Sequence, residues 1–296
     1  MRAAERGFLL LSSHLGDPAR KPLTVPQLRT LLRRMQSMDN PEPDRELDAA
    51  DLTALGYASD LAAHILKLLS EDALLDHYLK RAEQVHCVPL TRISAGYPLL
   101  LRKRLGLDSP GCLWVKGDGS LLAQPAVSLV GSRDLLEENR SFAEEVGRQA
   151  ALQGYVLVSG NARGADRAAQ ESCLAAGGQV ISVVADELCR QKMRENVLYV
   201  SEDGFSEAFS SIRAHSRNRV IHALGLKTFV AQSTLQTGGT WSGTVKNLQN
   251  HWSDVYCFRD GSAAMLQLEQ MGAALVGMDD LGSFYDLPKT ENLFDR

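Results

Sequence analysis

The amino-acid sequence predicts an α/β protein in which a small helical domain precedes a doubly wound, mostly parallel sheet. Two observations lead to this prediction. Up to about residue 86, apolar residues recur every three or four positions, as they do on one face of a helix. From residue 127 onward, short apolar runs without polar alternation are separated by helix-like segments. Such runs are typical of strands covered on both faces, and their alternation with helices predicts a doubly wound sheet.

Residues 1–86 are expected to form the helical domain. Thr24 and Gln27 have the spacing of a capping box, so a helix is predicted to begin there. The apolar residues that follow have the spacing of a buried helical face: Leu28, Leu31, Leu32 and Met35. A loop rich in Pro and Asp at 40–44 separates this helix from two further amphipathic stretches, at 52–55 and 59–82.

Residues 87–289 are expected to form the sheet domain, with 290–296 as a tail. The part from 87 to 118 has the pattern of a strand, a short helix and a further strand. Six strand-like runs then follow in order: 127–130, 155–159, 179–185, 198–201, 228–232 and 255–258. Ser141 and Glu144 predict a capping box for the helix that ends near Gln153, and an Ala-rich helix is predicted at 166–176. A sheet built in this order is Rossmann-like.

The composition excludes several classes of protein. With 44% hydrophobic and 23% charged residues among 296, the chain has the balance of a globular protein. Because the net charge is −4, any anion-binding site must be a local basic patch. No apolar run reaches the roughly 18 residues of a membrane span, and the apolar stretch near the N-terminus is too short for a signal peptide.

The cysteines and histidines indicate no metal chemistry. The five cysteines are far apart and form no CxxC pair, and the histidines lack the spacing of a metal site: Cys87, Cys112, Cys173, Cys189 and Cys257. We therefore expect reduced thiols in a cytoplasmic protein that uses no metal or cofactor.

The first candidate binding residues follow the apolar run at 127–130. Gly131 allows a sharp turn, Ser132 follows it, and Arg133 adds a fixed positive charge. Ligands of open α/β sheets bind at the carboxyl ends of the strands, which is where these residues fall. The alternative is that Gly131 only makes a turn and Arg133 is a solvated surface charge.

A glycine-rich loop at 159–166 is the second candidate. It links a predicted strand to a predicted helix, and loop amides at a helix N-terminus favour an anion. The residues expected to bind are Ser159, Gly160, Arg163 and Gly164. Asp166 is interpreted as the N-cap of the helix, with a catalytic carboxylate as the alternative.

The third candidate is the segment 216–225, in which Ser216 is predicted to cap a helix. Arg217, Asn218 and Arg219 would then lie in its first turn, where the helix dipole disfavours cations by about 0.3–1 kcal/mol each. Either exposure screens this cost, or a bound phosphate or a partner carboxylate lies between the arginines and the amides. We favour the second interpretation.

A loop dense in Gly, Thr and Ser at 236–244 is the fourth candidate. Thr237, Gly238 and Gly239 would form a backbone cradle for a phosphate or a ribose, with an ordinary loop as the alternative. No nucleophile, base and orienting group occur together near these loops, so no catalytic residue is predicted. His222 falls near the apolar side of its helix and is predicted to be packed.

In their order along the chain, these motifs resemble the DNA-processing protein DprA (Smf) family. The matching stretches are VGSR, SGNARGAD, RNRVIHALG, the glycine pair and Met271-Gly272-Ala273, within roughly 97–276. The resemblance implies a homodimer that binds single-stranded DNA and loads RecA recombinase during natural transformation or recombination, without catalysis. By motif match, a basic pocket would be lined by Arg133, Arg163, Arg217 and Arg219, with backbone donors from Gly131, Ser132, Gly160 and Gly164.

The chain also departs from the family pattern, which identifies it as a divergent member. Gln170 stands where the family usually has His, Gln232 replaces an acidic residue, and residues 214–216 replace the Phe-Pro pair before RNR. Base stacking would require exposed aromatic residues, and three lie near the proposed site: Phe205, Phe209 and Trp241.

The alternative to DNA binding is a nucleotide sensor or hydrolase related to the Lonely Guy phosphoribohydrolases. Residues 237–244 look like the PGGxGTxxE motif of those enzymes, but no Glu follows Thr244 at the catalytic position. The missing carboxylate argues against hydrolysis and leaves nucleotide sensing open.

Overall fold

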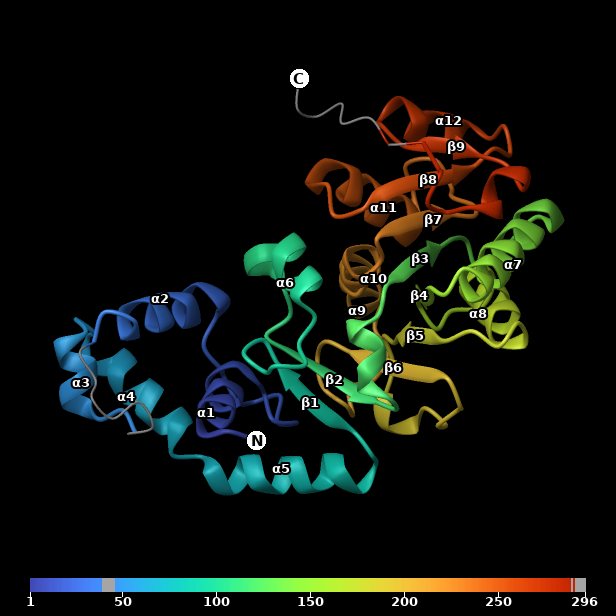
Figure 1. The fold of residues 1–296 in the computed structure, drawn as a ribbon. Coiled ribbons are helices and arrows are strands. Elements are labelled where there is room, and N and C mark those ends of the chain that lie inside the picture. Colours follow the sequence, from blue (N-terminus) through green and yellow to red (C-terminus); the bar gives the residue numbers. More distant parts are fainter. Residues whose placement is uncertain (39–45, 289, 291–296) are drawn as a thin grey trace.

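The computed structural model describes residues 1–38, 46–288 and 290. Figure 1 shows a group of helices beside a large twisted sheet. The loop predicted at 40–44 lies outside the described residues, as does the predicted tail apart from Thr290. Within the part of the chain that the structure describes, no helix is both long and apolar enough to cross a membrane.

Five helices begin the chain: α1 Ala3–Ser12, α2 Val25–Met35, α3 Ala49–Ala54, α4 Ser59–Leu69 and α5 Asp72–Gln84. The predicted start of α2 is confirmed, because Thr24 N donates to Gln27 Oε1 at 2.9 Å. The stretch predicted as one helix at 59–82 is instead two, since the chain turns at Ser70 and Glu71 between α4 and α5.

The first four helices enclose their own apolar cluster, which contains Phe8, Leu31, Leu52 and Ile65. Helix α5 packs elsewhere. Its Tyr78 ring lies edge-on to Trp114, with centroids 5.3 Å apart, within the cluster that also covers one face of the sheet. The two predicted domains therefore share a hydrophobic cluster, and the boundary at residues 86–87 stays a prediction.

The sheet has nine strands within the described residues: β1 Val88–Thr91, β2 Cys112–Lys116, β3 Ala126–Val130, β4 Val156–Ser159, β5 Val180–Val183, β6 Val197–Ser201, β7 Lys227–Val230, β8 Asp254–Phe258 and β9 Ala274–Val276. Their order is β1-β2-β6-β5-β4-β3-β7-β8-β9. All neighbours from β6 to β9 are parallel, whereas β1 and β2 are antiparallel at one edge. The predicted α/β fold with a mostly parallel sheet is confirmed, and each of the six predicted runs from residue 127 onward overlaps one strand. Strand β9 was not predicted.

Helices cover both faces of the sheet: α6 Leu99–Leu105, α7 Glu137–Leu152, α8 Ala165–Ala175, α9 Ser211–Ser216, α10 Asn218–Leu224, α11 Gly238–Asn250 and α12 Ala263–Gln270. Four short 3-10 helices lie in the connections: Gly106–Asp108, Gly119–Ala123, Leu188–Arg190 and Asp279–Gly282. Alternate strand residues point to opposite faces. Leu129 therefore lies in the apolar cluster that includes residues of α7 and α8, whereas Val130 lies in the cluster that includes residues of α6, α10, α11 and α12.

The predicted capping box at Ser141 and Glu144 is wrong. Helix α7 begins earlier, at Glu137, so Ser141 lies inside it and donates from Oγ to the carbonyl of Glu137 at 3.1 Å. The acidic pair Glu137 and Glu138 favours this earlier start, because carboxylates stabilise the first turn of a helix.

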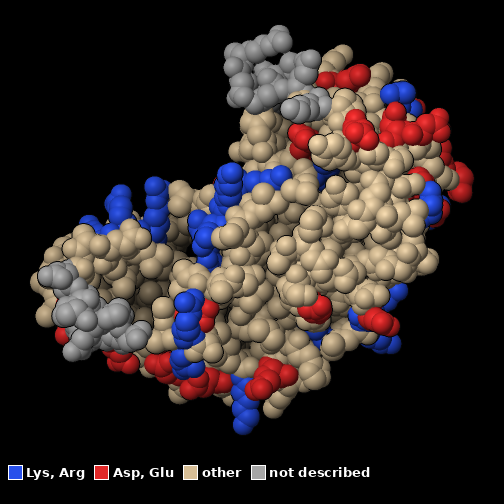
Figure 2. Space-filling model, in the orientation of Figure 1, with Lys and Arg blue, Asp and Glu red and all other residues tan. Residues whose placement is uncertain are grey.

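Charged side chains are unevenly distributed on the face seen in Figure 2. Lys and Arg gather over α2 and α6, on both sides of the hollow between them. Asp and Glu lie mostly along the opposite lower edge and over the far end of the sheet. Positive and negative groups are therefore separated on this face, although the net charge of the whole chain is −4.

Candidate functional site

The carboxyl ends of the central strands bring three of the predicted loops together. The strand order reverses between β3 and β7, and ligands of open α/β sheets bind outside the carboxyl ends at such a point. Ser132 N donates to the carbonyl of Gln232 at 3.0 Å, and Ala165 N donates to the carbonyl of Ser132 at 3.1 Å. Thr240 Oγ1 donates to the carbonyl of Gly131 at 3.0 Å. We call this region the carboxyl edge.

The glycines of the carboxyl edge allow these loops to pack closely. A Cβ on Gly131 would lie 2.5 Å from the Cβ of Ala165. Gly164 has φ +82°, and a Cβ there would lie 2.4 Å from the carbonyl oxygen of Arg133. A side chain at either position would force the loops apart. Close packing of the loops therefore explains why glycine stands at these two positions. Hydrogen bonding from their backbone amides to an anion stays a prediction.

Arg133 and Arg163 point their charges into solvent. The Arg163 side chain is 70% exposed, and its one ion pair, to Asp134 at 3.1 Å, is equally open because Asp134 is 85% exposed. Arg133 is exposed, and its guanidinium forms no ion pair or hydrogen bond with any residue that the structure describes. Both side chains are therefore available to an anion.

Arg217 lies buried against the loop after β4. Its guanidinium covers Gly160 so closely that a Cβ on that glycine would lie 1.7 Å from Nη1. Arg217 Nη2 lies 3.8 Å from Asp166 Oδ2, and Arg217 Nε has no hydrogen-bond partner among the described residues. Burial lowers the pKa of Arg217, and the Asp166 carboxylate opposes that shift.

The predicted role of Asp166 as an N-cap is wrong. Helix α8 has Gly164 at its N-cap, and Asp166 is the second residue of the helix. The carboxylate is buried, where it accepts a hydrogen bond from Ala162 N at 3.3 Å and faces Arg217. Burial raises the pKa of Asp166, and the nearby arginine opposes that rise.

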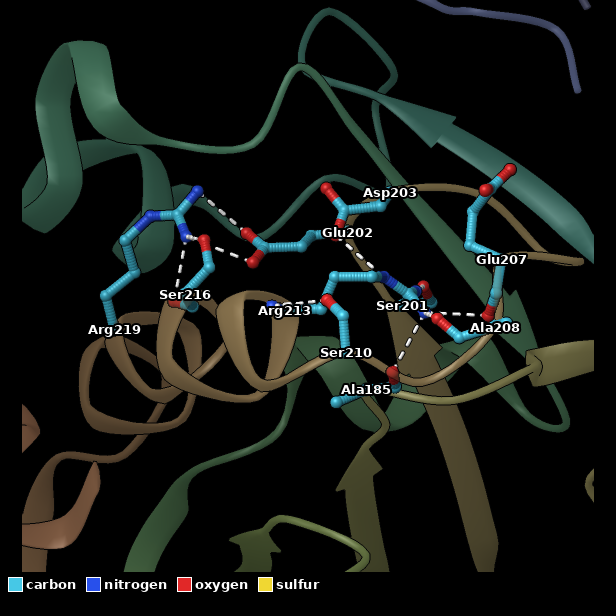
Figure 3. A network of polar contacts seen from close by, with 10 residues as sticks. All are labelled: Ala185, Ser201, Glu202, Asp203, Glu207, Ala208, Ser210, Arg213, Ser216 and Arg219. Carbon is cyan, nitrogen blue, oxygen red and sulfur yellow. Dashed lines mark hydrogen bonds and ion pairs between the residues drawn. The ribbon is translucent and has the colours of Figure 1, made fainter. Parts of the chain in front are cut away.

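Arg219 is held by a buried carboxylate (Figure 3). Its Nη1 donates to Glu202 Oε1 at 3.0 Å, and Nη2 lies 2.7 Å from Glu202 Oε2 in an ion pair. Its Nε donates to the carbonyl of Asp108 at 3.1 Å. The Glu202 side chain is only 4% exposed, so burial raises its pKa while Arg219 opposes that shift.

Ser216 does not cap a helix, which corrects the prediction for this segment. Ser210 caps α9 by accepting from Arg213 N at 3.1 Å, and Ser216 is the last residue of that helix. Arg217 alone separates α9 from α10, and backbone hydrogen bonds continue across it. A phosphate or a carboxylate was predicted to lie beside Arg217 and Arg219. The structure has a carboxylate at each arginine, Asp166 near Arg217 and Glu202 beside Arg219.

Arg213, which was not predicted as a site residue, is the centre of the polar network in Figure 3. Its Nε donates to Asp203 Oδ2 at 3.0 Å, and its Nη1 donates to the carbonyls of Ala185, Glu207 and Ala208 at 2.7–2.8 Å. These bonds fix the loop after β6 to the end of β5. No motif marks Arg213, because its partners, which include Asp203 and three backbone carbonyls, are brought near it only by the fold.

The glycine pair opens α11, as predicted for a loop leading into a helix. Thr237 is the N-cap, and Thr237 and Gly238 are exposed at the carboxyl edge. Asn218 Nδ2 donates to the carbonyl of Gly239 at 3.0 Å, so this loop lies beside the start of α10. Ser159 is instead buried, where it accepts a hydrogen bond from Gln170 Nε2 at 2.6 Å.

Two further expectations concern aromatic residues and His222. Phe205 is buried against Tyr78, with centroids 4.7 Å apart, so its predicted availability for base stacking is wrong. Phe209 is 56% exposed and Trp241 is half-buried. His222 is packed as predicted, and burial lowers its pKa to about 3. Among the described residues, no three His, Cys, Asp or Glu side chains gather closely enough to hold a metal ion.

These features define an α/β protein of the Rossmann-like class with arginines and glycines at its carboxyl edge. The family model of DNA recombination-mediator protein A matches residues 89–281, and the chain belongs to this family. The predicted resemblance is thereby confirmed. The departures at Gln170 and Gln232 are those of a divergent member.

Two relatives carry the name DNA processing protein DprA. The one from Streptococcus pneumoniae is 31% identical over 194 residues, covering 60% of this chain and 68% of the relative. The one from Bacillus subtilis is 25% identical over 169 residues, covering 53% of this chain and 56% of the relative. The match therefore spans little more than half of the Bacillus protein.

Two solved structures are similar to the fold. DprA from S. pneumoniae gives a TM-score of 0.66 at 25% identity, covering 86% of this chain and 95% of that one. DprA from Helicobacter pylori, which binds single-stranded DNA, gives a TM-score of 0.55 at 23% identity, covering 66% and 92%. These matches agree with the Rossmann-like fold.

Proposed function

We propose that this protein binds single-stranded DNA at the carboxyl edge through contacts with the phosphates. The observation that carries the proposal is the exposure of Arg133 and Arg163 near the point where the strand order reverses. Beside them lies the buried Arg217, whose Nε has no hydrogen-bond partner within residues 1–38, 46–288 and 290. The H. pylori relative supports it, because that protein binds single-stranded DNA.

The chemistry of binding follows from which groups are accessible. Guanidinium groups form charge-assisted hydrogen bonds to phosphate oxygens, and the release of counterions makes such binding weaken with salt. Arg133 and Arg163 would contact phosphates directly, and Thr237, Gly238 and Gly239 would offer amides at the start of α11. Phe209 and Trp241 are the aromatic residues that remain for stacking.

Further parts of the proposal come from the family resemblance and, for the cytoplasm, from the reduced cysteines. The protein would act without catalysis, as a homodimer in the cytoplasm, and would deliver the bound strand to RecA recombinase. Arg219, which the motif match assigned to the pocket, would act indirectly, because its guanidinium binds Glu202. Ser159, which was predicted from the glycine-rich loop, would also act indirectly, because its hydroxyl accepts from Gln170.

Fluorescence anisotropy with a labelled oligo-dT over a salt series tests the proposal. The wild type is compared with a variant carrying Arg133→Ala and Arg163→Ala. The loss of two phosphate contacts should weaken binding at least about tenfold at low salt and reduce the slope of log K against log salt by about 1.4.

The matched control replaces Lys80 and Arg81, exposed basic residues on α5, by alanine. This control has the same net charge as the arginine variant and should bind like the wild type. Absence of wild-type binding at low salt would contradict the proposal. If the wild type does not bind DNA but a free nucleotide raises its melting temperature, the nucleotide-sensor alternative would be favoured instead.

A further inference from the structure

A second basic surface lies outside the carboxyl edge, on helices α2 and α6. Together these helices carry six basic residues and no acidic residue: Arg29, Arg33, Arg34, Arg102, Lys103 and Arg104. The rest of the chain must be correspondingly acidic, since the net charge of the whole is −4. We call these six residues the α2–α6 surface.

Some of these residues bond to the rest of the fold, and others make no such bond within the described residues. Arg34 donates to the carbonyl of Leu55 at 2.8 Å, and Arg104 donates to the carbonyl of Ala223 at 3.1 Å. Arg102 makes one long contact, 3.4 Å to the carbonyl of Arg92. The remaining three are exposed and form no ion pair or side-chain hydrogen bond with any residue that the structure describes: Arg29, Arg33 and Lys103.

The α2–α6 surface is distinct from the carboxyl edge. Helix α6 packs on α10, and Arg104 lies beside Leu226 and Asp254. These two residues lie where β7 and β8 begin, so the last turn of α6 is at the amino ends of the strands. A strand of DNA bound at the carboxyl edge does not touch α6 without crossing this face of the molecule.

The exposed side of α2 has an unusual combination of residues. Val25, Arg29, Leu32 and Arg33 recur at the spacing of one helix face, and Val25 and Leu32 are 60% and 37% exposed. Arg29 and Arg33 are also one turn apart, a spacing at which like charges repel. No acidic residue of α2 offsets this repulsion, so an external anion would stabilise the surface.

We propose that the α2–α6 surface binds the phosphates of a second stretch of the single-stranded DNA held at the carboxyl edge. This inference rests on the proposed function. The basic groups lie on both sides of a hollow, which suits an extended polyanion (Figure 2). Neither helix contains an aromatic residue, so the contacts are to phosphates and carry no base preference.

Binding of oligo-dT strands of increasing length tests the inference. A variant with Arg29→Gln, Arg33→Gln and Lys103→Gln keeps the carboxyl edge intact, so it should bind short strands like the wild type. Strands long enough to reach α2 and α6 should bind about tenfold more weakly, with a salt slope reduced by about 2 for three lost phosphate contacts. Arg133→Ala with Arg163→Ala should weaken binding at every length.

The matched control carries Lys80→Gln, Arg81→Gln and Lys246→Gln, three exposed basic residues on α5 and α11. Its net charge equals that of the α2–α6 variant, so a general charge effect would weaken both alike and overturn the inference. Unchanged binding of long strands by the α2–α6 variant would also overturn it and would leave an acidic protein as the partner for this surface. If the wild type binds no strand of any length, the proposed function itself fails.

Discussion

Two pairs of arginines near the carboxyl edge have opposite environments. Arg133 and Arg163 follow strands β3 and β4 and hold their guanidinium groups in solvent. Arg213 and Arg219 lie on α9 and α10, and their donors are taken by carboxylates and carbonyls of the same chain (Figure 3). The first pair is free to bind a ligand, whereas the second pair fixes the loops that surround it.

A basic residue at a binding edge can therefore contribute in two ways. An exposed ion pair contributes about 0–1 kcal/mol to stability, so Arg163 costs the fold little and remains available. A buried charge left without its partner costs about 3–5 kcal/mol, so Arg219 and Glu202 depend on each other.

Removing the carboxylate of Glu202 should have the largest effect on stability. Glu202→Ala leaves the Arg219 guanidinium without its buried partner, and the free energy of unfolding should fall by about 3–5 kcal/mol. Urea denaturation measures this as a lower midpoint with an unchanged slope. A change below about 1 kcal/mol would mean that Arg219 is as free as Arg163.

His222, on the same helix as Arg219, should make stability depend on pH. Burial lowers its pKa to about 3 from 6.5, so the unfolded chain binds the proton more readily than the folded one. The stabilisation is complete above about pH 6.5 and is lost as the pH falls toward 3 and below, by at most about 5 kcal/mol. The difference in unfolding free energy between the wild type and His222→Gln should shrink over that interval; a constant difference would contradict a buried, neutral His222.

Gly160→Ala should test the close packing of Arg217. The added Cβ would overlap the guanidinium, so we expect a loss of about 1–3 kcal/mol, measured by urea denaturation. Gly119→Ala is the matched control, because a Cβ there meets nothing within 4 Å. Equal effects of the two substitutions would show that Arg217 moves away freely.

Asp134→Asn should have the smallest effect on stability. Asp134 is exposed and pairs with Arg163 in solvent, so the unfolding free energy should change by less than about 1 kcal/mol. Affinity for oligo-dT should rise about two- to threefold, because a negative charge beside a phosphate-binding arginine is removed. Weaker binding by this variant would mean that Asp134 orients Arg163 for its ligand.

Local patterns predicted the sheet, because each buried strand is an apolar run whose ends are marked by glycine or polar residues. The runs that became β3, β4 and β7, and the loops that follow them, lie where this pattern indicated. The glycine-rich loops were also recognisable, since Gly131 and Gly164 stand where neighbouring loops meet.

The partners of the arginines were not predictable in the same way. Glu202 precedes Arg219 by 17 residues, and Asp166 is far from Arg217 in the sequence, so only the folded sheet brings each pair together. The same holds for Phe205, which lies in a polar loop but is covered by Tyr78 of α5. The periodicity of apolar residues indicates which face of a segment is buried. It does not indicate which side chain, distant in the sequence, contacts that segment.

The most direct test of the division between the two pairs measures both binding and stability for both. Arg133→Ala with Arg163→Ala should lose affinity for oligo-dT at least about tenfold while the unfolding free energy changes by less than about 1 kcal/mol. Arg219→Ala should lower the unfolding free energy by about 3–5 kcal/mol, because Glu202 is left buried and unpaired. Under conditions in which it is folded, it should bind oligo-dT with the salt slope of the wild type. The opposite pattern, with affinity dependent on Arg219 and unaffected by Arg133 and Arg163, would contradict a DNA-binding site made of the exposed arginines.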